Sequence, residues 1–120
     1  MRRFVWVILA LSIGISAVSS LTAREEQRGM ATIALADLPK EARQTIVLIR
    51  KGGPFPYKRD GIVFGNFERR LPAHERGYYR EFTVRTPGSR DRGARRVISG
   101  KAGELYYSDD HYESFKRVLE

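Results

Sequence analysis

Hydrophobic and polar positions follow two different periods along this chain, and each period predicts one kind of element. Four apolar residues recur at close to 3.6-residue spacing: Leu38, Ala42, Ile46 and Ile49. This spacing is typical of a helix with one apolar face. Pro39 suits the first helical turn, where a missing N–H costs nothing, and Gly52 and Gly53 end the run. We predict a helix over 38–51, which is too short to be stable alone and should pack on a sheet.

Beyond this helix, apolar and polar residues alternate in short runs that are separated by turn residues. Within 78–85, the residues expected to face a core are Tyr78, Phe82 and Val84. The residues expected on the opposite side are Tyr79, Glu81, Thr83 and Arg85. Further short strands are expected at 62–64, 95–99, 105–107 and 115–119. One helix followed by several strands predicts an α+β fold, with one main N-terminal helix packed on a small antiparallel β-sheet.

The first 23 residues have the pattern of a secretory signal peptide. Arg2 and Arg3 precede an apolar run over 4–15, and a stretch rich in serine and alanine follows. Cleavage after Ser19 and cleavage after Ala23 both fit, and a retained membrane anchor is the alternative because 4–23 contains no charge. We expect a secreted, extracellular protein with a flexible N-terminal segment at 24–34 and one domain at 35–120.

Composition narrows the class of partner and the chemistry. The 120 residues contain 42% hydrophobic and 30% charged residues, a balance that excludes wholesale disorder. The formal net charge is +8; without Arg2 and Arg3, 20 basic and 14 acidic side chains remain, a net charge of +6. A protein this basic suits an anionic partner such as RNA, DNA or an acidic membrane surface, and charge alone leaves open the alternative of a soluble protein that is merely basic. With no cysteine and two histidines, we expect neither a disulfide nor a metal site, and no cofactor.

Three features have the residue types needed for phosphodiester chemistry. Glu81 lies in the middle of a predicted strand, His111 lies in a polar turn, and four arginines cluster in a loop: Arg90, Arg92, Arg95 and Arg96. Each feature alone is more typical of a solvated surface. Together they provide a base, an acid and cations that match phosphate oxygens, which RNA cleavage through the 2′-hydroxyl requires. Other phosphodiester chemistry would need the same set.

Three long segments resemble one known family in order and in spacing. They are GGPFPYKRDGIVFGNFE, GYYREFTVRTPGSRDRGARRVISG and ELYYSDDHYESF. From about residue 35 to residue 119 the chain resembles the small guanyl-specific microbial ribonucleases, the group of barnase and ribonuclease Sa. The resemblance implies an endoribonuclease that cleaves single-stranded RNA on the 3′ side of guanosine through a 2′,3′-cyclic phosphate, without metal.

The resemblance also implies roles for individual residues. Glu81 matches the general base, His111 the general acid, and Arg92 and Arg96 the arginines that bind the scissile phosphate. Tyr112 matches a tyrosine lining the phosphate site. Glu68 matches the glutamate that accepts hydrogen bonds from guanine. Asn66 and the backbone around Phe64–Phe67 match the loop that holds the guanine edge, although the family usually has arginine where this chain has Phe67.

The resemblance also suggests a small acidic barstar-like inhibitor protein as a second partner. We further expect a monomer that has no stable membrane association after signal cleavage. Two alternatives of another class stay open at this stage. One is a basic RNA-binding module without catalysis, and the other is an interaction module tethered to the membrane by residues 4–23.

Overall fold

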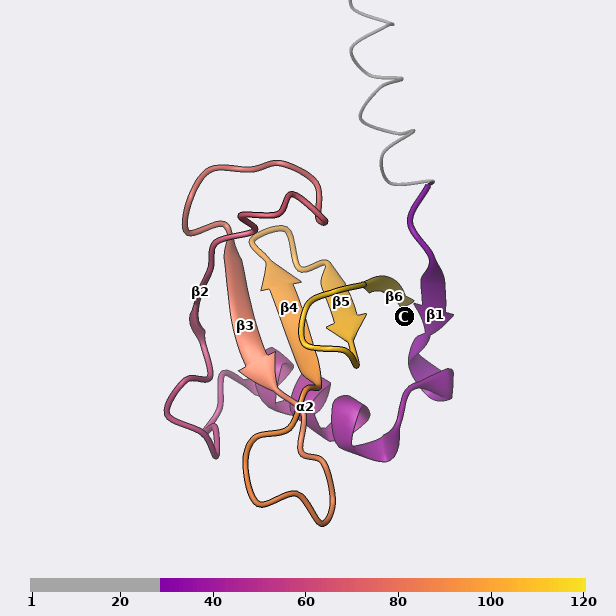
Figure 1. Ribbon diagram of the computed structural model, residues 1–120, viewed down its shortest axis with the longest axis vertical. Helices are drawn as coiled ribbons and strands as arrows, with labels where there is room; N and C mark the ends of the chain where they lie inside the picture. Colours follow the sequence, from indigo (N-terminus) through magenta and orange to yellow (C-terminus); the bar gives the residue numbers. More distant parts are fainter. Residues whose placement is uncertain (1–28) are drawn as a thin grey trace, which may run out of the picture. The chain divides into compact units, whose positions relative to one another are not determined.

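Helix α2 forms where the apolar spacing predicts a helix. It spans Lys40–Lys51 in the computed structural model, which describes residues 29–120 (Figure 1). Pro39 is the N-cap, so the helix begins two residues later than predicted. Gly52 ends it in the left-handed conformation, with φ of 84°, and donates its N–H to the carbonyl of Leu48. Glycine adopts this conformation without the steric penalty of a Cβ atom.

Six strands form one sheet, with the order β1-β6-β5-β4-β3-β2. Their bounds are Thr32–Ala34 (β1), Ile62–Phe64 (β2), Tyr79–Thr83 (β3), Arg96–Gly100 (β4), Leu105–Ser108 (β5) and Lys116–Leu119 (β6). All pairs are antiparallel except β1 with β6, which is parallel. Figure 1 shows β3, β4 and β5 side by side. The α+β fold with one main helix on a mostly antiparallel sheet is confirmed.

The structure differs from the prediction at 32–34, which we expected to belong to a flexible segment. These residues form β1, in which Ile33 pairs with Val118 of β6, and a short 3₁₀ helix, η1 (Leu35–Asp37), joins β1 to Leu38 and α2. A run of three residues is too short to show a period, and its pairing partner lies at the far end of the chain. The predicted signal peptide at 1–23 lies outside the described residues.

The hydrophobic core lies between α2 and the sheet. Its buried members come from the helix side, from the residue that follows β3 and from β4, β5 and β6: Leu38, Ala42, Ile46, Val84, Val97, Leu105, Tyr107 and Val118. The hydroxyl group of Thr45 in α2 lies 3.1 Å from the carbonyl oxygen of Thr83 at the end of β3, which joins helix to sheet. The predicted apolar face of the helix is therefore the face that packs.

The opposite face of β3 is also buried, which alternation alone does not predict. Tyr79, Glu81 and Thr83 are buried as well as Phe82 and Val84. Part of the cover comes from the segment before β3, since the hydroxyl of Tyr79 donates to the carbonyl oxygen of Pro72 at 2.6 Å. Loops thus cover the face that bears Glu81, and this covered face is where the candidate site forms.

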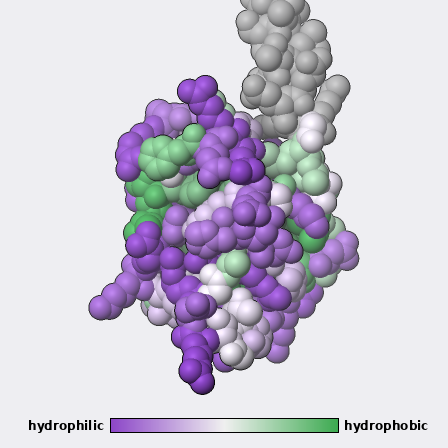
Figure 2. All heavy atoms as spheres, in the orientation of Figure 1, coloured by the Kyte–Doolittle hydropathy of each residue, from purple (hydrophilic) through white to green (hydrophobic). Residues whose placement is uncertain are grey.

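Within residues 29–120, no helix is long and apolar enough to cross a membrane. Figure 2 shows that the viewed face of the folded part is mostly hydrophilic, with an apolar area over β2 and the loop that follows it. The same loop contributes Phe67, a large apolar side chain that is 84% exposed.

Candidate functional site

A pocket of about 330 Å³ opens beside β2 and β3. It is lined by β2, the loop after β2, one residue of β3 and the loop that precedes β6. Six of the nine site residues expected from the sequence line it: Phe64, Asn66, Phe67, Glu68, Glu81 and Tyr112. Arg92, Arg96 and His111 lie outside this lining, and the contacts described below connect them to it.

The loop after β2 is held in shape by Asn66. Its side-chain amide donates to the carbonyl oxygen of Leu71 at 2.9 Å, and its side-chain oxygen accepts from the N–H of Leu71 at 3.1 Å. Asn66 and Arg69 have φ of 52° and 56°, in the left-handed region that asparagine tolerates better than most residues. Because both polar atoms of the Asn66 side chain bond within the loop, this residue shapes the pocket wall.

Two phenylalanines of this segment have different environments. The ring of Phe64 packs against Tyr112, with 5.1 Å between ring centroids, and against Phe115 at 5.8 Å. The ring of Phe67 lies over Gly65, so closely that a Cβ atom added to Gly65 would come within 2.5 Å of the ring. The guanidinium carbon of Arg76 lies 5.8 Å from the centroid of the same ring. Phe64 is therefore a packed wall of the pocket, whereas Phe67 presents an open aromatic surface at its rim.

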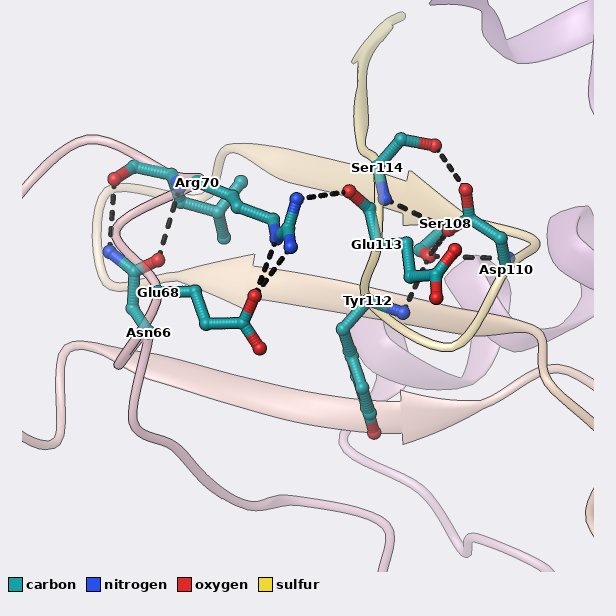
Figure 3. Close-up of polar contacts among 9 residues, drawn as sticks. Asn66, Glu68, Arg70, Ser108, Asp110, Tyr112, Glu113 and Ser114 are labelled. Atoms are coloured by element: carbon teal, nitrogen blue, oxygen red, sulfur yellow. Dashed lines mark hydrogen bonds and ion pairs between the residues drawn. The ribbon is translucent and has the colours of Figure 1, made fainter.

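Glu68 and Arg70 form an ion pair within the same loop. The guanidinium group of Arg70 donates to one carboxylate oxygen of Glu68 through both Nε and Nη2. Its third nitrogen, Nη1, donates to the main-chain carbonyl oxygen of Glu113 at 2.6 Å. Figure 3 shows Arg70 between Glu68 and Glu113, with Tyr112 nearby. The carboxylate of Glu68 is thus held at the pocket while its side chain stays 72% exposed.

Glu81, Thr83 and Arg96 lie on one face of the sheet. Residues two apart on a strand share a face, and so do residues directly opposite each other on antiparallel neighbours. Thr83 of β3 pairs with Arg96 of β4, which places the Arg96 side chain on the face of Glu81. Arg92 joins this face because its Nη1 donates to the hydroxyl oxygen of Thr83 at 3.1 Å.

Tyr112 connects the arginine and the glutamate. Its hydroxyl oxygen accepts from Nε of Arg96 at 3.0 Å, while Nη1 of Arg96 donates to the carbonyl oxygens of Gly93 and Arg95. Burial raises the pKa of the Tyr112 hydroxyl above its ordinary value of 10.0, and the negative charge of Glu81 raises it further. Tyr112 therefore remains a neutral hydroxyl between a buried cation and a buried carboxylate.

His111 lies at the tip of a turn that its neighbours brace. The hydroxyl oxygen of Ser108 accepts from the N–H of Tyr112, and Asp110 accepts from Ser108 and from the N–H of Ser114 (Figure 3). The hydrogen bonds from Ser114 lower the pKa of the Asp110 carboxyl, so the brace stays ionised. The N–H of His111 donates to the carbonyl oxygen of Ala94 at 2.9 Å, and its ring lies 4.9 Å from that of Tyr112. The histidine is thus exposed but fixed beside the site.

Comparison with known proteins decides the family. Residues 21–119 match the family model described as ribonuclease. Guanyl-specific ribonuclease St from Saccharopolyspora erythraea is 56% identical over 91 residues, which is 76% of this chain and 90% of that protein. Guanyl-specific ribonuclease Sa from Kitasatospora aureofaciens is 52% identical over 88 residues, which is 72% of this chain and 92% of that protein. This chain belongs to the guanyl-specific microbial ribonuclease family.

Solved structures agree with this ribonuclease fold. A crystal structure of ribonuclease Sa2 with guanosine-2′-cyclophosphate has a TM-score of 0.73 and 52% identity, and the match covers 76% of this chain and 97% of that one. A second structure, from a series of ribonuclease Sa2 complexes with mononucleotides, has a TM-score of 0.76 and 52% identity over 77% of this chain.

The structure therefore brings the expected ribonuclease residues to one region of the sheet. Two contributions were not anticipated from the sequence. Arg70 pairs with Glu68, and Ser108 with Asp110 braces the turn that bears His111. Glu68 and Arg70 are two positions apart, which permits a side-chain contact within one loop. Many surface arginines have a glutamate this close in sequence, so the spacing alone does not predict the ion pair. Among residues 29–120, no group of three or more acidic, histidine or cysteine side chains forms a metal-ligand cluster.

The raised pKa of Tyr112 predicts a loss of stability at alkaline pH. In the unfolded chain tyrosine ionises near its ordinary pKa of 10.0, whereas the folded protein keeps this proton to higher pH. The unfolded state then binds fewer protons, so the free energy of unfolding falls as pH rises above 10. Removing the hydroxyl in Tyr112→Phe should make the fall of the unfolding free energy with pH shallower. The upper limit is about 1.4 kcal/mol per pH unit, and the effect should be smaller because solvent screens a half-buried group.

Denaturant unfolding of wild type and Tyr112→Phe between about pH 8 and pH 11 measures this effect. Four other tyrosines with raised pKa stay in both proteins and provide a common background: Tyr78, Tyr79, Tyr106 and Tyr107. Identical slopes above pH 10 would mean that Tyr112 is no more difficult to ionise in the folded protein than in the unfolded chain.

Proposed function

We propose that this protein is a secreted endoribonuclease that cleaves single-stranded RNA on the 3′ side of guanosine through a 2′,3′-cyclic phosphate. The family membership and the printed activity of the relatives, guanyl-specific ribonucleases, support the reaction and the base. The ribonuclease Sa2 structure with guanosine-2′-cyclophosphate supports a cyclic phosphate on the reaction path. Secretion rests on the signal-peptide pattern of residues 1–23, which lie outside the described residues.

One observation supports this proposal most strongly. A single pocket contains two carboxylates from different elements, Glu68 from the loop after β2 and Glu81 from the middle of β3, with Tyr112 beside them. Tyr112 connects this pocket to Arg96, a buried cation. A base-specific ribonuclease site needs two such groups. One carboxylate recognises the base, and the other accepts a proton next to an arginine that binds the phosphate.

Base recognition follows from the chemistry of Glu68. An ionised carboxylate only accepts hydrogen bonds, and the Watson–Crick edge of guanine presents two adjacent donors, N1–H and the exocyclic amine. Adenine has no donor at N1, so it would leave a carboxylate oxygen without a partner. The loop can reach this edge only if the base is unpaired, which selects single-stranded RNA. The exposed ring of Phe67 at the rim offers a face on which a base can stack.

The cleavage step assigns one proton transfer to each of two residues. The carboxylate of Glu81 accepts the proton of the ribose 2′-hydroxyl as this oxygen bonds to phosphorus. The bond from phosphorus to the 5′-oxygen of the next nucleotide breaks, and the protonated imidazole of His111 donates its proton to that oxygen. The products are a 2′,3′-cyclic phosphate and a free 5′-hydroxyl.

Arg92 and Arg96 bind the phosphate oxygens and stabilise their growing charge, and the Tyr112 hydroxyl adds a neutral donor on the same side. Hydrolysis of the cyclic phosphate reverses the two roles. His111 removes a proton from water, water attacks phosphorus, and Glu81 returns a proton to the departing 2′-oxygen, which leaves a 3′-phosphate. Every step uses protein side chains, so we expect no requirement for a metal ion.

The acid–base assignment predicts a large loss of turnover in two variants that replace the titratable side chain with a neutral amide. Glu81→Gln and His111→Gln should each lower kcat on guanylyl-3′,5′-cytidine by about 10²–10⁴-fold, the usual contribution of general acid–base catalysis. Glu75→Gln and His74→Gln are matched controls, because both residues are exposed and lie outside the pocket lining. Steady-state kinetics in the presence of EDTA, with circular dichroism to verify folding, gives the result.

Each control should keep kcat within about twofold of wild type, as expected for a surface position that takes no part in proton transfer. Full turnover in Glu81→Gln or in His111→Gln would contradict the assignment of that residue. Abolition of wild-type turnover by EDTA would contradict a mechanism that uses side chains alone.

The recognition site predicts a change in base preference when Glu68 loses its charge. A glutamine at this position keeps one acceptor but places an NH₂ donor against the donors of guanine. The ratio of kcat/KM for guanylyl-3′,5′-cytidine to that for adenylyl-3′,5′-cytidine should fall by about 10–100-fold in Glu68→Gln, the effect of one lost charge-assisted hydrogen bond. If Glu68→Gln keeps the wild-type ratio, guanine is read elsewhere in the molecule.

A further inference from the structure

The position of Glu68 depends on a second residue of the same loop. Among residues 29–120, its carboxylate has one hydrogen-bond and ion-pair partner, the guanidinium group of Arg70. The third donor nitrogen of Arg70 bonds to the carbonyl oxygen of Glu113. We propose that Arg70 is a positioning residue that sets base affinity by holding Glu68 in the orientation that accepts guanine. This inference rests on the proposed role of Glu68.

The geometry leaves room for the base. Both bonds from Arg70 reach the same carboxylate oxygen, Oε2, so Oε1 has no partner among the described residues. Each carboxylate oxygen has two acceptor positions, which gives a carboxylate about four in all. The two bonds from Arg70 occupy both positions of Oε2, so the two positions of Oε1 are left for the two donors of guanine while Arg70 stays in place. Arg70 acts together with the base and does not compete with it.

The ion pair contributes to orientation far more than to the stability of the fold. The side chains of Arg70 and Glu68 are 42% and 72% exposed, and solvent screens an ion pair at such positions. A base that enters the pocket removes this solvent, and the attraction between the two charges then increases. The two N–H groups of the Arg70 guanidinium fork hold Oε2 of Glu68 in place before binding, so the substrate does not have to immobilise a free side chain.

The bond to Glu113 anchors this fork to a second loop. Glu113 follows Tyr112 directly, in the turn that is braced by Ser108 and Asp110 and that bears His111 (Figure 3). Arg70 thus connects the loop that recognises the base to the loop that donates the proton. A lysine at this position has a compact ammonium group that cannot hold both partners in one plane.

Three variants separate this role from a general effect of charge. Arg70→Met removes the fork, Arg70→Lys keeps the charge, and Arg69→Met removes one positive charge at the adjacent position. The side chain of Arg69 makes no hydrogen bond or ion pair with residues 29–120 and does not line the pocket, so it is a matched control. The substrate is guanylyl-3′,5′-cytidine, and thermal unfolding verifies that each variant folds.

Arg70→Met should raise KM about tenfold and leave kcat within about twofold, because one charge-assisted contact that orients Glu68 is lost while the groups that transfer protons are intact. Arg70→Lys should restore less than half of the lost affinity, and Arg69→Met should keep the wild-type KM. In a Glu68→Gln background, Arg70→Met should have no further effect on KM, because the residue through which Arg70 acts has already lost its charge.

The outcomes distinguish this inference from the proposed function. Suppose that wild type prefers guanine, that Glu68→Gln loses this preference, and that Arg70→Met keeps the wild-type KM. The proposed function then stands, and the proposed role of Arg70 is wrong. A lower KM in Arg70→Met would show that Arg70 competes with the base. An unchanged effect of Arg70→Met in the Glu68→Gln background would show that Arg70 contacts the substrate directly. If Glu68→Gln itself keeps the guanine preference, the recognition site is wrong whatever Arg70 does.

Discussion

The guanidinium group of Arg96 is almost completely buried, and a buried ion is stable only where hydrogen-bond acceptors surround it. The carbonyl oxygens of Gly93 and Arg95 and the hydroxyl oxygen of Tyr112 meet this requirement. To supply them, the loop before β4 must fold back on its own strand, and the loop before β6 must approach β3 and β4. The need to satisfy one cation thus brings together the segments that contain Arg92, His111 and Tyr112.

The part of the site proposed to recognise the base is held together by different contacts. The loop after β2 has neither helix nor strand geometry, and it is held by short-range polar contacts: the Asn66 side chain bonds to the backbone of Leu71, and Glu68 bonds to Arg70. The bond from Arg70 to Glu113 joins this loop to the turn that bears His111. Base affinity and turnover can therefore respond to different residues, although one pocket contains both carboxylates.

The sequence predicts the helix and most of the sheet because these elements have local signals. Pro39, the apolar spacing and Gly52 define α2 to within two residues, and 62–64 is a strand as predicted. β1 could not be predicted in this way, because a run of three residues has no measurable period. These residues form a strand because they pair with β6, the last strand of the chain. Burial of both faces of β3 likewise depends on loops whose paths a strand pattern does not encode.

The candidate residues came from the family resemblance, and the structure adds how they are held. The pattern around Glu81 is typical of a solvated strand, yet the side chain is only 8% exposed because Tyr112 and the neighbouring loops cover its face. For Asn66, the resemblance indicates a place in the loop that holds the guanine edge, and the structure adds that both polar atoms of its side chain bond inside this loop. The ion pair of Arg70 has no sequence signal, since an arginine beside a glutamate is common on any basic surface.

In the proposed site, Glu68 recognises the base and the phosphate lies beside Glu81 and Arg96. A crystal structure of this protein with guanosine 3′-monophosphate would show both contacts at once. We expect the N1–H and the amine of guanine on the Glu68 carboxylate, with Arg70 still bonded to it. We expect the phosphate within hydrogen-bond reach of Arg96, the Tyr112 hydroxyl and the His111 ring. A nucleotide bound with its base away from Glu68, or with its phosphate away from Arg96, would contradict the proposed site.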